Sequence, residues 1–277
     1  MLKVAKCIMK DFVLEKENII RKYGEWTAYD IKLTDTLYTR DIRQPNPALK
    51  KIVTMIQDIT QCDFKNLRIL DLACLEGHYA IEFAMQGATV VGIEGRESNI
   101  QKAIFAKDLL RLENLTFYQD DVRNLSAEKY GHFDIVLCSG ILYHLDCSDV
   151  FPFLEKVYKV CKRFVIIDTH ITSTPNVSVL YKNYEYKGHT MLEHSANSSI
   201  EERLKSKWAS LDNVTSFWMT KSSLYNFLTR TGFSSINESR SLVQEDRITV
   251  VAFKKYPIEI KSSPETEKYI EPDYLEC

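Results

Sequence analysis

The sequence lacks the features that mark membrane, secreted and nucleic-acid-binding chains. No apolar run in its 277 residues approaches the ~20 that cross a bilayer, and charges interrupt the apolar residues of the first twenty positions. The formal net charge is -2, so the chain has no basic excess that would attract phosphate backbones. These absences predict a cytoplasmic protein without membrane contact, and they favour a small-molecule ligand over nucleic acid.

The seven cysteines include no C-x-x-C pair. A disulfide framework and a tetrahedral metal site are therefore both disfavoured, and a reducing compartment fits the thiols. In the stretch "YKGHTMLEH", His189 and His194 lie five residues apart, which is not the i, i+4 spacing of a helical zinc pair. The sequence predicts no metal site.

Apolar runs alternate with helical patterns along most of the chain. The predicted strands are 67–72, 89–93, 115–119, 133–138, 163–168, 234–239 and 247–254, and the predicted helices are 78–86, 97–110, 148–161 and 221–231. Strands that alternate with helices form right-handed crossovers and a mostly parallel sheet. The sequence predicts an α/β fold, Rossmann-like, with a seven-stranded, mostly parallel sheet and helices on both faces.

Four parts are predicted along this chain. An N-terminal helical or lid segment covers 1–60, a binding core covers 61–168 and 217–256, a cap covers 169–216, and a flexible tail covers 257–277. No clean strand is expected between Thr169 and Thr220. The cap is rich in aromatic residues, which suit either an acceptor pocket or a packed core of its own.

Acidic side chains stand at the ends of successive predicted strands. Asp71, Glu94 and Asp121 each follow an apolar run, and ligands of such sheets bind at the carboxyl ends of the strands. A carboxylate at the position of Glu94 can accept hydrogen bonds from both hydroxyls of a ribose. For Asp71 the alternative role is to cap the following helix, and for Glu94 it is a solvated strand end.

The turn after the first strand holds one glycine where a dinucleotide site needs more. In "RILDLACLEGHYAIEFA", Ala73 and Leu75 stand where glycines usually admit a pyrophosphate, and only Gly77 remains. S-adenosylmethionine has no phosphate, and its amino group suits Asp71. The turn therefore favours S-adenosylmethionine over NAD.

These motifs resemble the class I S-adenosylmethionine-dependent methyltransferases. "DLACLEG" matches their first motif with two glycines replaced, "VVGIEGRESN" supplies the ribose acid, "YQDDVRNL" supplies an acid for the adenine amino group, and "LCSGILYHL" matches the fourth-strand motif. The resemblance and the motifs together predict these cofactor-binding residues: Trp26, Tyr29, Asp71, Ala73, Gly77, Glu94, Gly95, Asp121, Val122 and Cys138.

Within that superfamily, "LYH" and "SFWMTKSSLYNFLTRTGF" look like the tRNA wobble-uridine carboxymethyltransferases and their small-molecule, natural-product relatives. The segment "YGEWTAYDIKLTDTLYT" is similar to an N-terminal stretch of such small-molecule enzymes that folds over the cofactor.

Two histidines follow predicted strands where an acceptor would meet the methyl group. An imidazole with a pKa near neutrality can remove a proton, so His144 and His170 are candidate catalytic bases; the alternative is that each only holds its loop by hydrogen bonds. Tyr143, Tyr184 and Tyr186 are the predicted acceptor contacts.

The sequence thus predicts a methyltransferase that modifies an oxygen or nitrogen of a small molecule, such as a secondary metabolite. The first alternative is an RNA-modifying enzyme, which the resemblance to the tRNA enzymes suggests and the basic clusters at 159–163 and 203–207 support modestly. An NAD-dependent oxidoreductase and an inactive cofactor-binding protein are the others.

Overall fold

The structure, a computed structural model, describes residues 2–40, 46–240, 244 and 246–255. The stretch 257–277, predicted to be a flexible tail, lies outside the described residues. The chain falls into two compact units that divide between Asp120 and Asp121. Within the described ranges, no helix combines the length and the apolar character that a membrane crossing requires.

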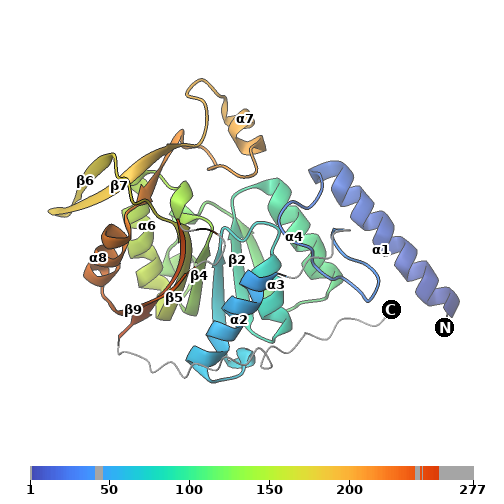
Figure 1. The fold of residues 1–277 in the computed structure, drawn as a ribbon. Helices are drawn as coiled ribbons and strands as arrows, with labels where there is room; N and C mark the ends of the chain where they lie inside the picture. The colour runs from blue at the N-terminus through green and yellow to red at the C-terminus, as the bar shows by residue number, and fades with distance from the viewer. Residues whose placement is uncertain (1, 41–45, 241–243, 245, 256–277) are drawn as a thin grey trace. The chain divides into compact units, whose positions relative to one another are not determined.

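The first unit begins with helices and continues as alternating strands and helices (Figure 1). Its elements are α1 (Leu2–Tyr23), α2 (Pro47–Thr60), η1 (Phe64–Asn66), β1 (Arg68–Leu72), α3 (His78–Met85), β2 (Thr89–Glu94), α4 (Glu97–Leu109) and β3 (Leu115–Gln119). β2 pairs with both β1 and β3, and all three strands are parallel. Parallel neighbours need a crossover connection, which α3 and α4 supply.

The start of α2 illustrates how local sequence sets an element boundary. The Asn46 side chain accepts a hydrogen bond from the Leu49 N–H, and Pro47 occupies the first helical turn. Both are helix-start signals, because the asparagine satisfies a free N–H while proline has none to satisfy. The buried residues of α2 recur at helical spacing: Leu49, Ile52, Val53, Ile56 and Ile59. The helix therefore buries a single apolar face.

The second unit continues the alternation and then adds an insert. Its elements are η2 (Val122–Asn124), α5 (Ala127–Tyr130), β4 (Phe133–Ser139), η3 (Leu142–His144), α6 (Cys147–Val160), β5 (Cys161–His170), β6 (Val177–Tyr181), β7 (Tyr184–Leu192), α7 (Ile200–Lys205), β8 (Thr215–Met219), α8 (Lys221–Thr231), β9 (Phe233–Arg240) and β10 (Arg247–Lys254). β4 and β5 are parallel, whereas β10 runs antiparallel to both β5 and β9.

The strand order confirms the predicted fold class. Seven strands form one mixed sheet in the order β3-β2-β1-β4-β5-β10-β9, as predicted for a Rossmann-like, mostly parallel sheet with crossover helices. The largest difference in length is in β5, which extends beyond the predicted 163–168 at both ends to Cys161–His170.

The segment after β5 corrects one expectation. It contains a separate antiparallel sheet of order β6-β7-β8, so the prediction of no clean strand between Thr169 and Thr220 is wrong. The hairpin β6–β7 is visible as a long yellow ribbon in Figure 1. Of the nine residues of β7, only Tyr186 and Gly188 are buried, so the strand lacks the regular apolar alternation that a sequence reading requires.

Gly188 explains how this small sheet packs. A Cβ at this position would lie 2.4 Å from Cε2 of Phe217, a residue of β8 that is 2% exposed. The glycine therefore leaves room for the Phe217 ring across the neighbouring strand.

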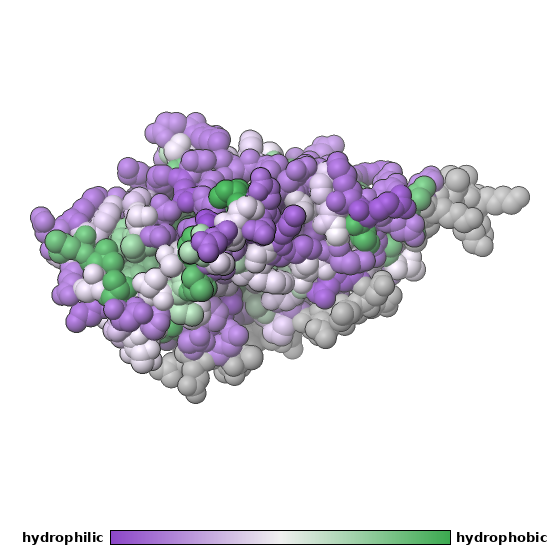
Figure 2. Space-filling view, turned by 90° about the horizontal axis from the view of Figure 1, so that it is seen from above, coloured by the Kyte–Doolittle hydropathy of each residue, from purple (hydrophilic) through white to green (hydrophobic). Residues whose placement is uncertain are grey.

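Hydrophilic residues cover most of the face shown in Figure 2, and hydrophobic residues form small separate groups on it. The insert nevertheless exposes some large apolar side chains, with Leu180 at 72%, Leu192 at 73% and Trp208 at 64%. Scattered apolar side chains of this kind are normal on a protein surface.

Candidate functional site

The turn between β1 and α3 has the backbone conformation of a glycine-rich turn, although Gly77 is its one glycine. Ala73 has φ 53°, Leu75 has φ 49° and Gly77 has φ 83°, so all three lie in the left-handed region. For an ordinary L-residue this region costs roughly 1–2 kcal/mol. Ala73 and Leu75 therefore adopt a backbone that glycine would reach more easily, and the opening between strand and helix is preserved.

Two glycines in this unit are required by the ring of Phe117. A Cβ added to Gly77 would lie 2.7 Å from Phe117 Cζ, and one added to Gly92 would lie 2.6 Å from the same ring. These separations are too short for any side chain. The two glycines thus let β3, β2 and the turn approach one another closely.

The carboxylate of Glu94 joins the end of β2 to this turn. It is 3% exposed, and its oxygens accept hydrogen bonds from the N–H groups of Leu75 at 2.9 Å and Arg96 at 2.8 Å. Burial raises the pKa of this carboxyl above its ordinary value, against the lowering effect of these hydrogen bonds. Glu94 is therefore a fixed, buried acid and not a solvated strand end.

Asp71 is a second buried acid, at 1% exposure. Its Oδ2 accepts a hydrogen bond from the Ala80 N–H at 3.1 Å, so it also satisfies a free donor in the first turn of α3. Burial, with a smaller contribution from the nearby Glu94 carboxylate, raises the pKa of Asp71 to about 8.

These two acids allow a test of which ligand fits. Burial and the neighbouring Glu94 carboxylate both disfavour the charged form of Asp71, so a cationic group beside it would be favoured and a pyrophosphate opposed. S-adenosylmethionine carries an ammonium and a sulfonium and no phosphate, so the acids of the first unit fit it.

A buried ion pair, which sequence reasoning missed, ties the N-terminal segment to the turn. Lys102 of α4 is 0% exposed, and its Nζ lies 2.5 Å from Oε1 of Glu76, whose side chain is 2% exposed. The Glu76 carboxylate also accepts hydrogen bonds from the N–H groups of Thr27 and Ala28. The only signal in the sequence was the acid itself, beside Gly77.

The two aromatic residues predicted to cover the cofactor lie in this anchored segment. Trp26 is 3% exposed, with its ring 5.9 Å from that of Phe105 in α4. Tyr29 is 40% exposed and stacks on His78, the first residue of α3, at 5.1 Å. Tyr29 is thus the more exposed of the two, and the cofactor contact of each stays a prediction.

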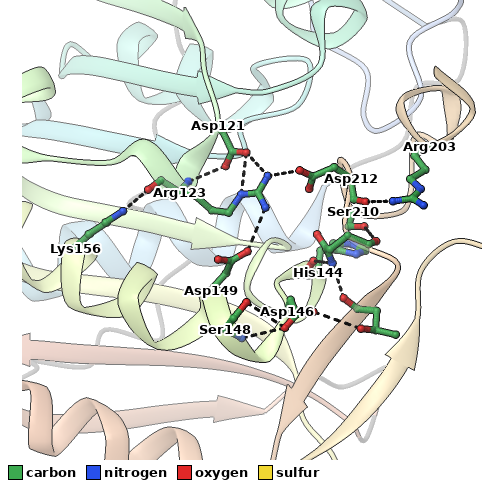
Figure 3. Close-up of polar contacts among 12 residues, drawn as sticks. Asp121, Arg123, His144, Asp146, Ser148, Asp149, Lys156, Arg203, Ser210 and Asp212 are labelled. Carbon is green, nitrogen blue, oxygen red and sulfur yellow. Dashed lines mark hydrogen bonds and ion pairs between the residues drawn. The ribbon is translucent and has the colours of Figure 1, made fainter. Parts of the chain in front are cut away.

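In the second unit, the predicted adenine acid is engaged by an arginine. Asp121 accepts hydrogen bonds from Arg123 through Nε at 2.9 Å and NH2 at 2.5 Å. Figure 3 shows the same guanidinium bound to Asp149 and Asp212. Hydrogen bonds from the guanidinium to the three carboxylates raise the pKa of Arg123, and the bond to Asp121 contributes most. Whether Asp121 also binds adenine stays a prediction.

The other predicted cofactor contacts differ in accessibility. Val122 is 4% and Cys138 0% exposed, so both side chains are packed inside the second unit. Gly95, in the first unit, follows β2 and is partly exposed.

His144 is fixed by a carboxylate from the insert. Its Nδ1 lies 3.0 Å from both Oε1 and Oε2 of Glu193, which directly follows β7. The side chain of Glu193 is 7% exposed, and it accepts a further hydrogen bond from the Ser210 N–H at 2.8 Å. Asn213 donates to the carbonyl oxygen of His144 at 3.0 Å. Sequence reasoning identified the histidine but missed Glu193, Ser210 and Asn213.

Tyr143 and Trp218 bring the two candidate histidines together. The Tyr143 ring centroid lies 4.3 Å from that of His144 and 4.7 Å from that of His170. Trp218 stacks on His170 at 4.7 Å with an interplanar angle of 18°. One aromatic group therefore contains both imidazoles.

His170 has a weaker acidic partner than His144. Its Nδ1 lies 3.1 Å from Asp246, whose side chain is 52% exposed. Burial lowers the pKa of His170 below its ordinary value, with a partial offset from Asp246. Burial of His170 therefore favours its neutral form.

Tyr184 and Tyr186, both of β7, lie in different surroundings. Tyr186 is 2% exposed and packs among the rings of Phe151 and Phe227. Tyr184 is 48% exposed, with the Arg230 guanidinium 4.0 Å above its ring. Tyr186 therefore belongs to the aromatic core of the unit, and an acceptor contact by either tyrosine stays a prediction.

Comparison with known proteins identifies a family match. Residues 63–232 match the family model described as "Methyltransferase domain". The ubiquinone biosynthesis O-methyltransferase of Acinetobacter baylyi is 28% identical over 104 residues, which are 38% of this chain and 41% of that protein. The chain thus matches less than half the length of this curated relative.

Two solved structures share the fold. The N-terminal domain of EvdMO1, determined in the presence of SAH and D-fucose, aligns with a TM-score of 0.68 at 20% identity, covering 88% of this chain and 96% of that one. Magnesium protoporphyrin IX methyltransferase from Synechocystis PCC 6803, with bound SAH, aligns with a TM-score of 0.52 at 15% identity, covering 90% of this chain and 100% of that one.

Proposed function

The chain belongs to the methyltransferase-domain family, and from this premise we propose that it transfers the methyl group of S-adenosylmethionine to a hydroxyl oxygen of a small molecule. The observation that carries the proposal is the pair of buried acids, Asp71 and Glu94, beside a turn with the left-handed backbone of a glycine-rich loop. A cationic, phosphate-free nucleoside fits that pair.

On this proposal, Asp71 would hold the amino group of the cofactor and Glu94 its ribose hydroxyls. When bound, the sulfonium supplies an electrophilic methyl group. Glu94 is already fixed by two backbone N–H groups, so it needs no reorganisation to accept the hydroxyls. Asp121, Val122 and Cys138 remain predicted cofactor contacts of the second unit.

The residues of the second unit support a hydroxyl acceptor. Two imidazoles lie in an aromatic group with Tyr143 and Trp218, and a hydroxyl must lose a proton as its oxygen is methylated. Aromatic walls with a few polar groups suit a partly apolar small molecule. Positioning of the acceptor against the methyl carbon then supplies much of the rate.

Two of the three named relatives support the same class of acceptor without defining it. One is an O-methyltransferase by name, and the structure of the other was determined in the presence of D-fucose, a sugar with several hydroxyls. A sugar hydroxyl and a phenol are therefore both suitable first probes.

The test has a binding arm and a transfer arm. Calorimetry should show micromolar binding of S-adenosylhomocysteine and no binding of NAD; the reverse result would refute the proposal. Mass spectrometry after incubation with S-adenosylmethionine and a panel that includes D-fucose, catechols and primary amines should show a mass gain of one methylene on a hydroxyl compound. Methylation of amines alone would reject the oxygen acceptor while retaining the methyltransferase.

A further inference from the structure

We propose that the insert supplies a positioning residue for the methyl transfer: Glu193 fixes His144 with Nδ1 protonated, so that Nε2 of His144 is the base that receives the proton of the acceptor hydroxyl. The inference rests on the proposed function. It assigns a role to the three-stranded insert and ranks His144 above His170.

The geometry of the pair favours this assignment. Both oxygens of Glu193 lie 3.0 Å from Nδ1 of His144, and a carboxylate can only accept there, so Nδ1 must be the protonated nitrogen. In a neutral imidazole the remaining nitrogen then carries the lone pair. Among the described residues, no hydrogen bond involves Nε2 of His144.

The surroundings of Glu193 hold the carboxylate itself in place. The Ser210 N–H donates to Oε2 at 2.8 Å, and hydrogen bonding to His144 lowers the pKa of Glu193 although burial opposes it. Asn213 links the carbonyl oxygens of His144 and Thr215 through its Nδ2, at 3.0 Å and 2.6 Å. Glu193, directly after β7, and Asn213, just before β8, therefore both fix the position of His144.

Comparison with His170 explains the ranking. The side chain of its partner Asp246 is 52% exposed, against 7% for Glu193, and only one Asp246 oxygen is hydrogen-bonded to His170. A buried carboxylate stabilises a neighbouring imidazolium more strongly, because water screens it less. His144 therefore gains more support for the positive charge that forms on proton transfer.

The step balances without a further reagent. Nε2 of His144 takes the hydroxyl proton, and the electron pair of that oxygen forms the bond to the methyl carbon. The carbon–sulfur bond breaks with its electron pair left on sulfur. The imidazolium, paired with Glu193, afterwards releases its proton to water.

The first experiment is nuclear magnetic resonance of the full chain with 15N-labelled histidine, in the presence of S-adenosylhomocysteine. Signals of His144 are assigned by their loss in His144→Ala. The neutral wild-type ring should carry its proton on Nδ1. A ring protonated on Nε2 would overturn the proposal, and this readout requires neither a variant of Glu193 nor an acceptor.

The second experiment compares Glu193→Gln with a matched control in the same insert. Glu185→Gln removes a carboxylate that accepts from Ser178 at 2.5 Å and, among the described residues, is hydrogen-bonded to neither histidine. The groups that face His144 are Glu193 and Tyr143, with His170, Asp168 and Arg247 beyond Tyr143. Glu193→Gln should lose the fixed tautomer, so the 15N signals of His144 should show the proton shared between both ring nitrogens, because an amide can donate as well as accept at Nδ1; Glu185→Gln should leave these signals unchanged.

The third readout is methyl transfer to a hydroxyl compound from the panel. Glu193→Gln should reduce kcat about tenfold or more, with the KM for S-adenosylmethionine within twofold. A loss of kcat accompanied by an equal rise in that KM would indicate a merely structural role and refute the inference. Full activity of His144→Ala would refute it while leaving the proposed methyltransferase intact, whereas failure of the wild type to bind S-adenosylhomocysteine would refute the proposed function itself.

Discussion

The acids of the first unit and the histidines of the second are held by different means. Glu94 and Glu76 are fixed largely by backbone N–H groups, from Leu75 and Arg96 for one and from Thr27 and Ala28 for the other. The histidines are held by side chains far along the sequence: Glu193 lies 49 positions after His144, and Asp246 lies 76 positions after His170.

By this comparison the acids of the first unit form a fixed binding site, whereas the surroundings of the histidines in the second unit can vary. Backbone donors in a turn vary little when side chains change, so they suit a ligand that stays the same. Side chains contributed by an insert can be exchanged while the sheet remains folded, so they suit an acceptor that differs between relatives. The comparison predicts that substitutions in the first unit damage folding and cofactor binding, while those in the insert damage turnover.

The largest expected effect is the loss of the buried ion pair. Glu76→Gln would leave the ammonium of Lys102 buried without its counter-charge, which typically costs about 3–5 kcal/mol. Denaturant unfolding of the full chain measures this as a fall in the free energy of unfolding. The control Lys107→Met removes a partly exposed lysine paired with an exposed aspartate, and it should change stability by less than about 1 kcal/mol.

The double variant Glu76→Gln with Lys102→Met sharpens this result. It removes both charges, so much of the lost stability should return. A single variant as stable as the wild type would mean that water reaches Lys102 and that the N-terminal segment is not anchored through this pair.

The next effect is on cofactor affinity. Glu94→Ala should weaken S-adenosylhomocysteine binding by roughly 2–4 kcal/mol, because the ribose hydroxyls lose a charged acceptor and the N–H groups of Leu75 and Arg96 lose theirs. Calorimetry measures the change. Glu97→Ala, an exposed acid in the first turn of α4, is the matched control and should bind normally. Unchanged affinity in Glu94→Ala would show that this carboxylate only supports the turn.

A smaller effect is expected from pH. Asp71, with its pKa raised to about 8, must ionise to hold a cationic amino group, so S-adenosylhomocysteine should bind about tenfold more tightly at pH 8 than at pH 6.5. Asp71→Asn should abolish that dependence and bind weakly at both values. An affinity independent of pH in the wild type would contradict the role of Asp71.

The Asp71 carboxyl also predicts how the free energy of unfolding of the ligand-free protein depends on pH. A carboxyl whose pKa is higher in the folded than in the unfolded state stabilises the fold below the unfolded pKa, and this contribution is lost as pH rises through the folded pKa. The free energy of unfolding should therefore fall between about pH 4 and pH 8, the range between an ordinary carboxyl pKa and that of Asp71. Asp71→Asn should flatten this part of the curve.

The sequence predicted the sheet because the strands β1, β2, β4, β5 and β10 are largely buried and appear as apolar runs. It predicted Asp71 and Glu94 because both directly follow such runs. The strands β6 and β7 were missed because they bury few positions, and Glu193 was missed because nothing near it in the chain marks it as the partner of His144. Lys102 could not be predicted either, since a lysine on a helix is ordinarily solvated, and only the folded chain places it beside Glu76.

The smallest effect tests the turn itself. Ala73, at φ 53°, should gain from substitution by glycine, because the left-handed strain of about 1–2 kcal/mol is relieved while the added backbone freedom of glycine costs roughly 0.5–1 kcal/mol. Ala73→Gly should therefore raise the free energy of unfolding by up to about 1 kcal/mol, with S-adenosylhomocysteine affinity unchanged. The control Ala84→Gly lies within α3, where the backbone is helical, and it should lower stability by a similar amount. Equal destabilisation by both variants would show that the turn does not strain Ala73, and that the missing glycines are replaced without cost.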